Sequence, residues 1–222
     1  MKYISFLFLF FVSYSFSQEM KDIDKLSIDI CNSINKSKEK EDSIKIQNAF
    51  SENFSPFAEK FKLSDLSDDL AQKIDYRLQK NCDWYQIYLS KIYGYNEKSD
   101  WKILDQKPEI KVKANECKDF FNKHSKFYYF ESEGNKTLVD VSNNFWIDKF
   151  TDGTYSKLSF KLQSCHFELQ FIESNNIGRN NFSSQNDIYY YDIVSIEKNI
   201  LTVIAYQKDS TKYYQFKLYA TD

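Results

Sequence analysis

The sequence predicts an α+β protein in which a helical N-terminal module of about three helices precedes an eight-stranded antiparallel β-barrel. The first observation is a change of hydrophobic period. Apolar residues recur every three or four positions up to residue 94 and every second position after residue 117. The second observation is that eight β-rich segments with short connections follow one another, which is typical of an antiparallel meander closed into a barrel.

The first residues have the pattern of a signal peptide. Lys2 provides a positive charge, residues 4–14 are rich in Phe and Leu, and the small residues Ser15 and Ser17 follow. We expect cleavage of residues 1–17, so that the mature chain begins at Gln18. The alternative is a buried N-terminal element. Because the apolar run is shorter than the roughly 20 residues that span a bilayer, we expect no stable membrane insertion.

Helical spacing of apolar residues predicts the first module. The first helix covers residues 23–34. The second begins near Ser43 and should be kinked or split at Pro56, because proline cannot donate its backbone hydrogen bond. The third follows Ser64 as a helix N-cap, and its apolar face extends to Gly94. The aromatic residues along these stripes are read as core rather than as a ligand site.

The predicted boundaries are a signal peptide at 1–17, a helical module at 18–94, a linker at 95–116 and the barrel at 117–222. The linker is charged, contains Pro108 and has few bulky apolar residues, so it should be exposed and partly extended.

Alternation of apolar and polar residues predicts the strands, and Asp152-Gly153 is a strong hairpin turn. A polar loop is expected at 175–187. The eight strands cover 127–132, 137–142, 145–150, two runs within 157–172, then 188–197, 200–206 and 212–220.

The two strands within 157–172 form the central hairpin, with apolar residues on one face. An eight-stranded barrel is just wide enough either to be filled by side chains or to hold one small ligand. Both states stay open here. The inward candidates for lining a ligand site are Phe160, Leu162, Phe167, Leu169, Phe171, Tyr214 and Phe216.

Four cysteines follow the signal pattern, and an even number in an exported chain indicates disulfides. Three pairings are open. If the chain has two modules, the local pairing is Cys31 with Cys82 and Cys117 with Cys165. We therefore expect an exported protein, periplasmic or extracellular.

The layout resembles a group of small exported bacterial proteins of unknown function that combine a cysteine-bearing helical segment with a lipocalin-like barrel. The resemblance is carried by Cys31 and Cys82, by the Cys-x-x-Phe start at 117–120, and by the run Cys-His-Phe-Glu-Leu at 165–169. It implies the lipocalin-like fold for most of the mature chain, and it supplies no catalytic residues.

The sequence departs from that pattern in three places. Residues 125–127 read Ser-Lys-Phe where Gly-x-Phe is usual, Leu162 stands in place of a Trp, and His166 replaces an acidic residue. These departures leave the fold as expected and put an inherited ligand chemistry in doubt.

Composition and motifs argue against most reaction classes. A net charge of -2 gives no field for nucleic acid, and with four glycines no phosphate-binding loop occurs. Only His124 and His166 could join cysteines around a metal, so no metal or cofactor is expected. His166 and Glu168 share one strand face, which should be the outer, solvated one.

The expected function is a non-catalytic binding module of the bacterial envelope that holds a small apolar ligand in the barrel. The alternative is a structural or protein-interaction component with a filled barrel, in which the helical module docks onto an envelope protein. An enzyme is the third hypothesis. It would need a polar cleft at the barrel mouth, built from the loop 175–187 together with His124.

Overall fold

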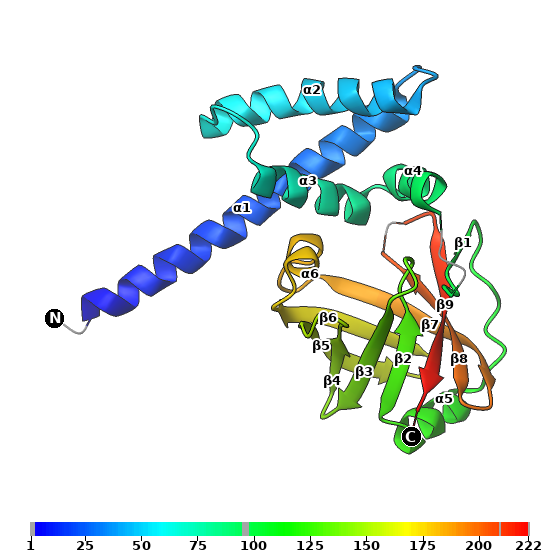
Figure 1. The fold of residues 1–222 in the computed structure, drawn as a ribbon. Helices are drawn as coiled ribbons and strands as arrows, with labels where there is room; N and C mark the ends of the chain where they lie inside the picture. Colours follow the sequence, from blue (N-terminus) through cyan, green and yellow to red (C-terminus); the bar gives the residue numbers. More distant parts are fainter. Residues whose placement is uncertain (1–2, 95–97, 209, 222) are drawn as a thin grey trace. The chain divides into compact units, whose positions relative to one another are not determined.

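The computed structural model describes the backbone of residues 3–94, 98–208 and 210–221, and the side chains of these ranges from Met20 onward (Figure 1). The chain divides into two compact units, Met1–Ile92 and Tyr93–Asp222. The first unit is helical and the second contains the barrel, so the predicted α+β class is confirmed.

The helical unit is built around the buried face of one long helix. Its elements are α1 (Tyr3–Lys36), α2 (Asp42–Phe61), α3 (Asp68–Asn81) and α4 (Asp83–Tyr93). Both α2 and α3 pack on α1. The core of the unit consists of Ile23, Leu26, Ile30, Cys31, Ile34, Ala49, Ile74, Leu78 and Cys82.

Helix α1 begins at Tyr3, so the predicted signal segment is helical and continuous with the first helix of the unit. Cleavage after Ser17 stays a prediction. Among the described residues, no helix has an apolar stretch long enough to cross a membrane.

We expected a kink or a split at Pro56. The split is wrong, because α2 continues through this residue. Proline removes a single backbone donor, and this part of the helix is held by its neighbours Phe54 and Phe57, which pack on the core of the unit.

The third helix also differs from the prediction at both ends. Its N-cap is Ser67 rather than Ser64, since the Ser67 side chain accepts a hydrogen bond from the Leu70 amide at 3.3 Å. It ends at Asn81 because Cys82 is extended (φ -134°, ψ 98°) and is bonded to Cys31. A separate helix, α4, therefore follows.

The barrel contains eight antiparallel strands and a ninth short strand attached to it. Strand β9 pairs with both β2 and β8, which closes the barrel, while β1 pairs only with β9. The bounds are β1 Lys102–Leu104, β2 Lys126–Phe130, β3 Lys136–Ser142, β4 Phe145–Lys149, β5 Tyr155–Gln163, β6 His166–Ser174, β7 Ile188–Glu197, β8 Ile200–Tyr206 and β9 Tyr213–Ala220.

All eight predicted strands are present within a few residues of their expected bounds. Within the barrel unit, two helices and β1 were not predicted. Helix α5 (Ala114–Lys123) begins inside the segment expected as a linker, and helix α6 (Ile177–Phe182) lies inside the expected polar loop. The segment 98–116 thus contributes β1 and the start of α5 to the barrel unit.

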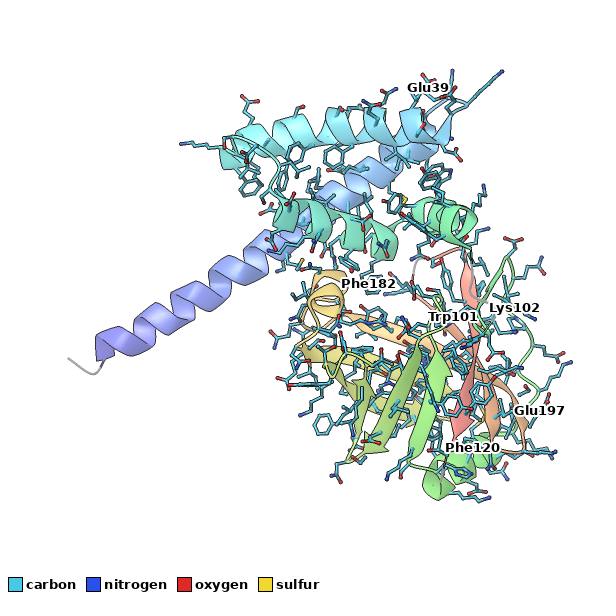
Figure 2. The ribbon with its side chains drawn as sticks, in the orientation of Figure 1. Glu39, Trp101, Lys102, Phe120, Phe182 and Glu197 are labelled. Carbon is cyan, nitrogen blue, oxygen red and sulfur yellow. A yellow bond between two sulfur atoms is a disulfide. The ribbon has the colours of Figure 1, made fainter. Side chains whose placement is uncertain are left out.

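Helix α5 closes one end of the barrel. Phe120 is buried, and Phe121 contacts Phe160 at 5.1 Å between ring centroids. The Cys117–Cys165 disulfide ties α5 to the turn between β5 and β6. Helix α6 lies at the other end, and Figure 2 shows Phe120 and Phe182 at opposite ends of the barrel.

The segment between β1 and α5 crosses the outer face of β7 and β8. The Lys111 amide donates to the Val194 carbonyl at 3.1 Å, and Lys212 Nζ pairs with Asp105 Oδ1 at 2.6 Å. Because residues 105–113 cover this face, Val194 and Ile204 are buried on the outside of the barrel. We call residues 105–113 the strap.

Candidate functional site

The middle of the barrel is filled by side chains in mutual contact. The Phe167 ring stacks on Tyr191 with centroids 4.7 Å apart and on Trp146 at 5.7 Å. Four of the seven residues predicted to line a ligand site are buried in this core: Phe167, Leu169, Phe171 and Phe216. Two more, Phe160 and Leu162, are partly buried and pack against it. The seventh, Tyr214, is half-buried opposite Ala205 of β8.

A group of polar side chains lies at the barrel end that carries α6. We call Tyr129, Glu131, Asp148, Arg179 and Tyr191 the mouth cluster. Its members come from β2 and the residue after it, from β4, from α6 and from β7. None of them was predicted as a site residue.

Alternation along the strands puts the aromatic and carboxylate members of the mouth cluster on the inner face. Tyr129, Asp148 and Tyr191 each stand two residues from a core residue of the same strand. Those core neighbours are Phe127 at 1%, Trp146 at 3% and Ile193 at 0% exposure, whereas the three cluster members are only half-buried.

This contrast locates the open part of the interior. An inner-facing side chain in a closed barrel can be exposed only through the interior or its mouth. Tyr129, Asp148 and Tyr191 therefore keep part of their surface accessible at the α6 end, next to the packed middle layer.

Specific contacts hold the two carboxylates of the mouth cluster. Arg179 Nη2 lies 2.6 Å from Glu131 Oε1, and the Thr137 hydroxyl donates to the same oxygen at 2.8 Å. Trp146 Nε1 donates to Asp148 Oδ1 at 2.8 Å. Among the described residues, no cationic side chain forms an ion pair with Asp148.

The protonation of the mouth cluster follows from this arrangement. Burial raises the pKa of Asp148 to about 7, although the Trp146 hydrogen bond and the charge of Arg179 act in the opposite direction. Burial also raises the pKa values of Tyr129 and Tyr191, so both phenols are neutral donors at pH 7. Burial acts to lower the pKa of Arg179, but Glu131, Tyr129 and Asp148 together outweigh it and raise this pKa, so Arg179 stays charged.

Helix α6 is fastened across the barrel end by its polar residues. The Asn176 side chain caps the helix by accepting from the Arg179 amide at 3.0 Å, and its Nδ2 donates to Thr154 Oγ1 at 2.8 Å. The hydroxyls of Ser183 and Tyr189 are 2.6 Å apart.

One buried group of α6 has no partner. Asn181 is the buried residue of the helix, at 6% exposure, and its Nδ2 lacks a hydrogen-bond acceptor. A buried amide donor without an acceptor costs roughly 1–3 kcal/mol. Helix α6 contacts β6. An acceptor on a bound molecule would satisfy this amide.

A second polar group lies on the outer face of the barrel. His166 Nδ1 lies 2.9 Å from Asp192 Oδ1, and His166 Nε2 lies 3.8 Å from Glu168 Oε1. Asp192 is 2% exposed and also pairs with Lys107 of the strap, whose Nζ lies 3.3 Å from the Tyr206 hydroxyl.

The sequence placed His166 and Glu168 on the outer face, and they lie there, but His166 is half-buried and bonded rather than simply solvated. The carboxylate of Asp192 fixes the strap and the ring together. In the part of the chain that the structure describes, no group of three or more His, Cys, Asp or Glu residues is arranged to hold a metal ion.

A surface groove of about 600 Å³ lies between α5 and the turn from β7 to β8. Its wall contains Glu116, Lys123 and His124 of the α5 region, with Glu197 and Lys198 of the turn. His124 therefore lies at the α5 end of the barrel, whereas the loop 175–187 carries α6 at the other end (Figures 1 and 2). The expected cleft combining the two is not formed.

No protein-family model matches this chain, and no curated protein is significantly similar to it. The candidate site is therefore defined by the geometry of this chain alone.

Proposed function

We propose that this protein is an exported, non-catalytic binding protein of the bacterial envelope whose lipocalin-like barrel holds one small molecule at the α6 end. The observation that carries the proposal is the mouth cluster, whose inner-facing members Tyr129, Asp148 and Tyr191 are half-buried beside a packed middle layer. The ligand would lie beside Tyr129 and Tyr191, with its polar groups toward α6.

The chemistry of the mouth cluster supports binding of a molecule with both apolar and polar parts. The expected small apolar ligand fits the aromatic rings but leaves the Asn181 amide without an acceptor and Asp148 without an ion partner. Ligand pockets commonly combine apolar walls with a few polar groups that fix orientation. The mouth cluster has that composition.

Export is supported by two kinds of observation. Both pairs of cysteines form disulfides, which persist in oxidising compartments such as the periplasm and the extracellular space. The N-terminal residues have the charge and apolar pattern of a signal peptide. Expression of the full chain in an exporting bacterium should yield a protein that begins at Gln18, and recovery of a chain that retains residues 1–17 would contradict export by this signal.

Native mass spectrometry of the exported protein tests the binding function. The expected spectrum contains a species heavier than the polypeptide, which loses a small molecule on denaturation. The variant Asn181→Leu, which keeps a similar volume without the amide, should lose that species. His166→Gln on the outer face is the matched control and should keep it. Spectra of the wild type that contain only the bare polypeptide, from several host and growth conditions, would overturn the proposal.

The second candidate is a protein-interaction component, and α4 favours it. This helix carries Trp84, Tyr85 and Tyr88, which are only partly buried, although Trp84 and Tyr85 pack against the core of the helical unit. A photo-crosslinking residue at Tyr88 should then give one reproducible adduct with an envelope protein, while the same residue at Glu52 of α2 should give none. Equal, diffuse crosslinking from both positions would speak against this candidate.

A further inference from the structure

The mouth cluster contains one more acidic than basic group. Arg179 is hydrogen-bonded to Glu131 at 2.6 Å, so these two charges offset each other. Asp148 accepts its hydrogen bond from the uncharged Trp146 ring at 2.8 Å. When Asp148 ionises, it has no salt-bridged cation of its own among the described residues, and Arg179, whose charge also acts on it, is already paired with Glu131.

A half-buried carboxylate without a paired cation is disfavoured in its ionised form, and the protein can respond in two ways. The carboxyl can take up a proton, or a positively charged group can bind beside it. An anion at this position would meet an ionised Asp148 and Glu131 with only one arginine, so the balance of charge excludes anionic groups. A neutral group would leave the ionised form of Asp148 uncompensated.

The rings around Asp148 also favour a cation. Trp146 lies two residues before it on the same face of β4, and the inner-facing phenols Tyr129 and Tyr191 both interact electrostatically with Asp148. The faces of tryptophan and tyrosine rings attract organic cations, and this attraction is strongest where water is excluded. The half-buried rings of Tyr129 and Tyr191 next to a carboxylate are therefore a suitable environment for an ammonium group.

We propose that the barrel ligand is a small organic ammonium compound whose charged nitrogen binds Asp148 and whose apolar body lies on the aromatic middle layer. This inference rests on the proposed binding function and specifies the chemical class of its ligand. Asn181 Nδ2 supplies a further donor, so an acceptor such as a hydroxyl or carbonyl oxygen on the ligand body adds to the affinity.

Binding of the cation requires the ionised form of Asp148. Because the pKa of Asp148 is about 7 in the free protein, about a tenth of the protein has an ionised carboxyl at pH 6 and about nine tenths at pH 8. The affinity for the ammonium compound should therefore be about tenfold lower at pH 6 than at pH 8.

Three probes with one common ring separate the ligand classes. Benzylammonium, benzyl alcohol and benzoate should be titrated into the full-length exported protein by calorimetry at pH 6 and pH 8, after dialysis to remove any bound molecule. We expect benzylammonium to bind, benzyl alcohol to bind at least tenfold more weakly, and benzoate to show no heat of binding.

Matched variants locate the site. Asp148→Asn keeps the shape of the side chain and should weaken benzylammonium binding at pH 8 at least tenfold and remove its pH dependence. Glu168→Gln, which removes a carboxylate from the outer face, should leave the binding unchanged. Unchanged benzylammonium affinity in folded Asp148→Asn protein would overturn the inference, as would equal affinity for benzyl alcohol or benzoate.

The outcomes also distinguish this inference from the binding function itself. If the exported protein carries a neutral or anionic molecule in native mass spectra and does not bind benzylammonium, the ammonium assignment is wrong and the binding function stands. If it carries no molecule and binds none of the three probes, both are wrong.

Discussion

The guanidinium of Arg179 lies 2.6 Å from the Glu131 carboxylate, and this ion pair joins α6 to the end of β2. The same guanidinium lies over the Phe150 ring, 5.0 Å from its centroid, just after β4. Arg179 therefore bridges two strand ends, and it holds α6 over the part of the interior where the mouth cluster is half-buried.

Removal of this ion pair should loosen α6. Arg179→Met keeps much of the side-chain length and leaves Glu131 without its cation, so we expect a loss of about 1–2 kcal/mol in the free energy of unfolding. The value is below that of a fully buried pair because the Arg179 side chain is 38% exposed.

Urea unfolding of Arg179→Met, Glu131→Gln and the double variant measures the coupling of the pair. The double variant should be less destabilised than the sum of the two single changes. Additive losses would show that Arg179 and Glu131 act independently.

The Asp148 carboxyl should make stability depend on pH in an unusual direction. Its pKa is raised to about 7 in the folded protein, so the folded state binds the proton more strongly than the unfolded chain does. Its contribution to stability is fully present below about pH 4 and is lost as the pH rises through about 7, by at most about 4 kcal/mol.

The comparison with Asp148→Asn isolates this contribution. The difference in unfolding free energy between the variant and the wild type should grow in favour of the variant between pH 4 and pH 7.5. A difference that is constant with pH would show that Asp148 titrates normally.

Each disulfide should stabilise its own unit against unfolding. Each closes a loop of about 50 residues, with sequence separations of 51 and 48, which is worth roughly 4 kcal/mol in the chain-entropy model. The double change Cys31→Ser/Cys82→Ser should unfold the helical unit first, because that unit has the smaller buried core.

Amide hydrogen exchange measures the protection of backbone amides in each unit separately. In the Cys31→Ser/Cys82→Ser protein, protection should fall in α1 and α3 and remain in β6 to β9, whereas Cys117→Ser/Cys165→Ser should have the reverse effect. Loss of protection in both units from either change would contradict their independence.

The buried Asp192 should hold the strap on the barrel. Asp192→Asn removes the charge that pairs with Lys107 and His166, and we expect a loss of about 2 kcal/mol together with trypsin cleavage after Lys111 or Lys113. Glu168→Gln is the control, because its side chain is 34% exposed and lies 3.8 Å from His166. It should stay resistant to trypsin, and an equally resistant Asp192→Asn would show that other contacts hold the strap.

The alternation of apolar residues was sufficient to predict the eight barrel strands, and the change of period separated them from the helices. Helix α5 was missed although Cys117, Phe120, Phe121 and His124 have helical spacing, because ten residues at the start of a strand-rich region give a weak periodic signal. Strand β1 has three residues, too few for any alternation to be recognised.

Most of the mouth cluster could not be predicted from the sequence, for a different reason. Asp148 follows the strand alternation as an inward position, and polar inward residues are rare enough that it could have been noticed in the run 145–150. Arg179 and Asn181 gave no comparable signal. They come from a six-residue helix within a polar segment, and only the closed barrel brings that segment over Asp148.

The most direct test is an NMR titration of the Asp148 carboxyl carbon in the full-length protein, with and without benzylammonium. The free protein should give a pKa of about 7, and the bound cation should lower it by at least one unit, because the ammonium group stabilises the ionised carboxylate. A carboxyl that titrates near pH 4 in the free protein, or whose pKa is unchanged by saturating benzylammonium, would contradict the account.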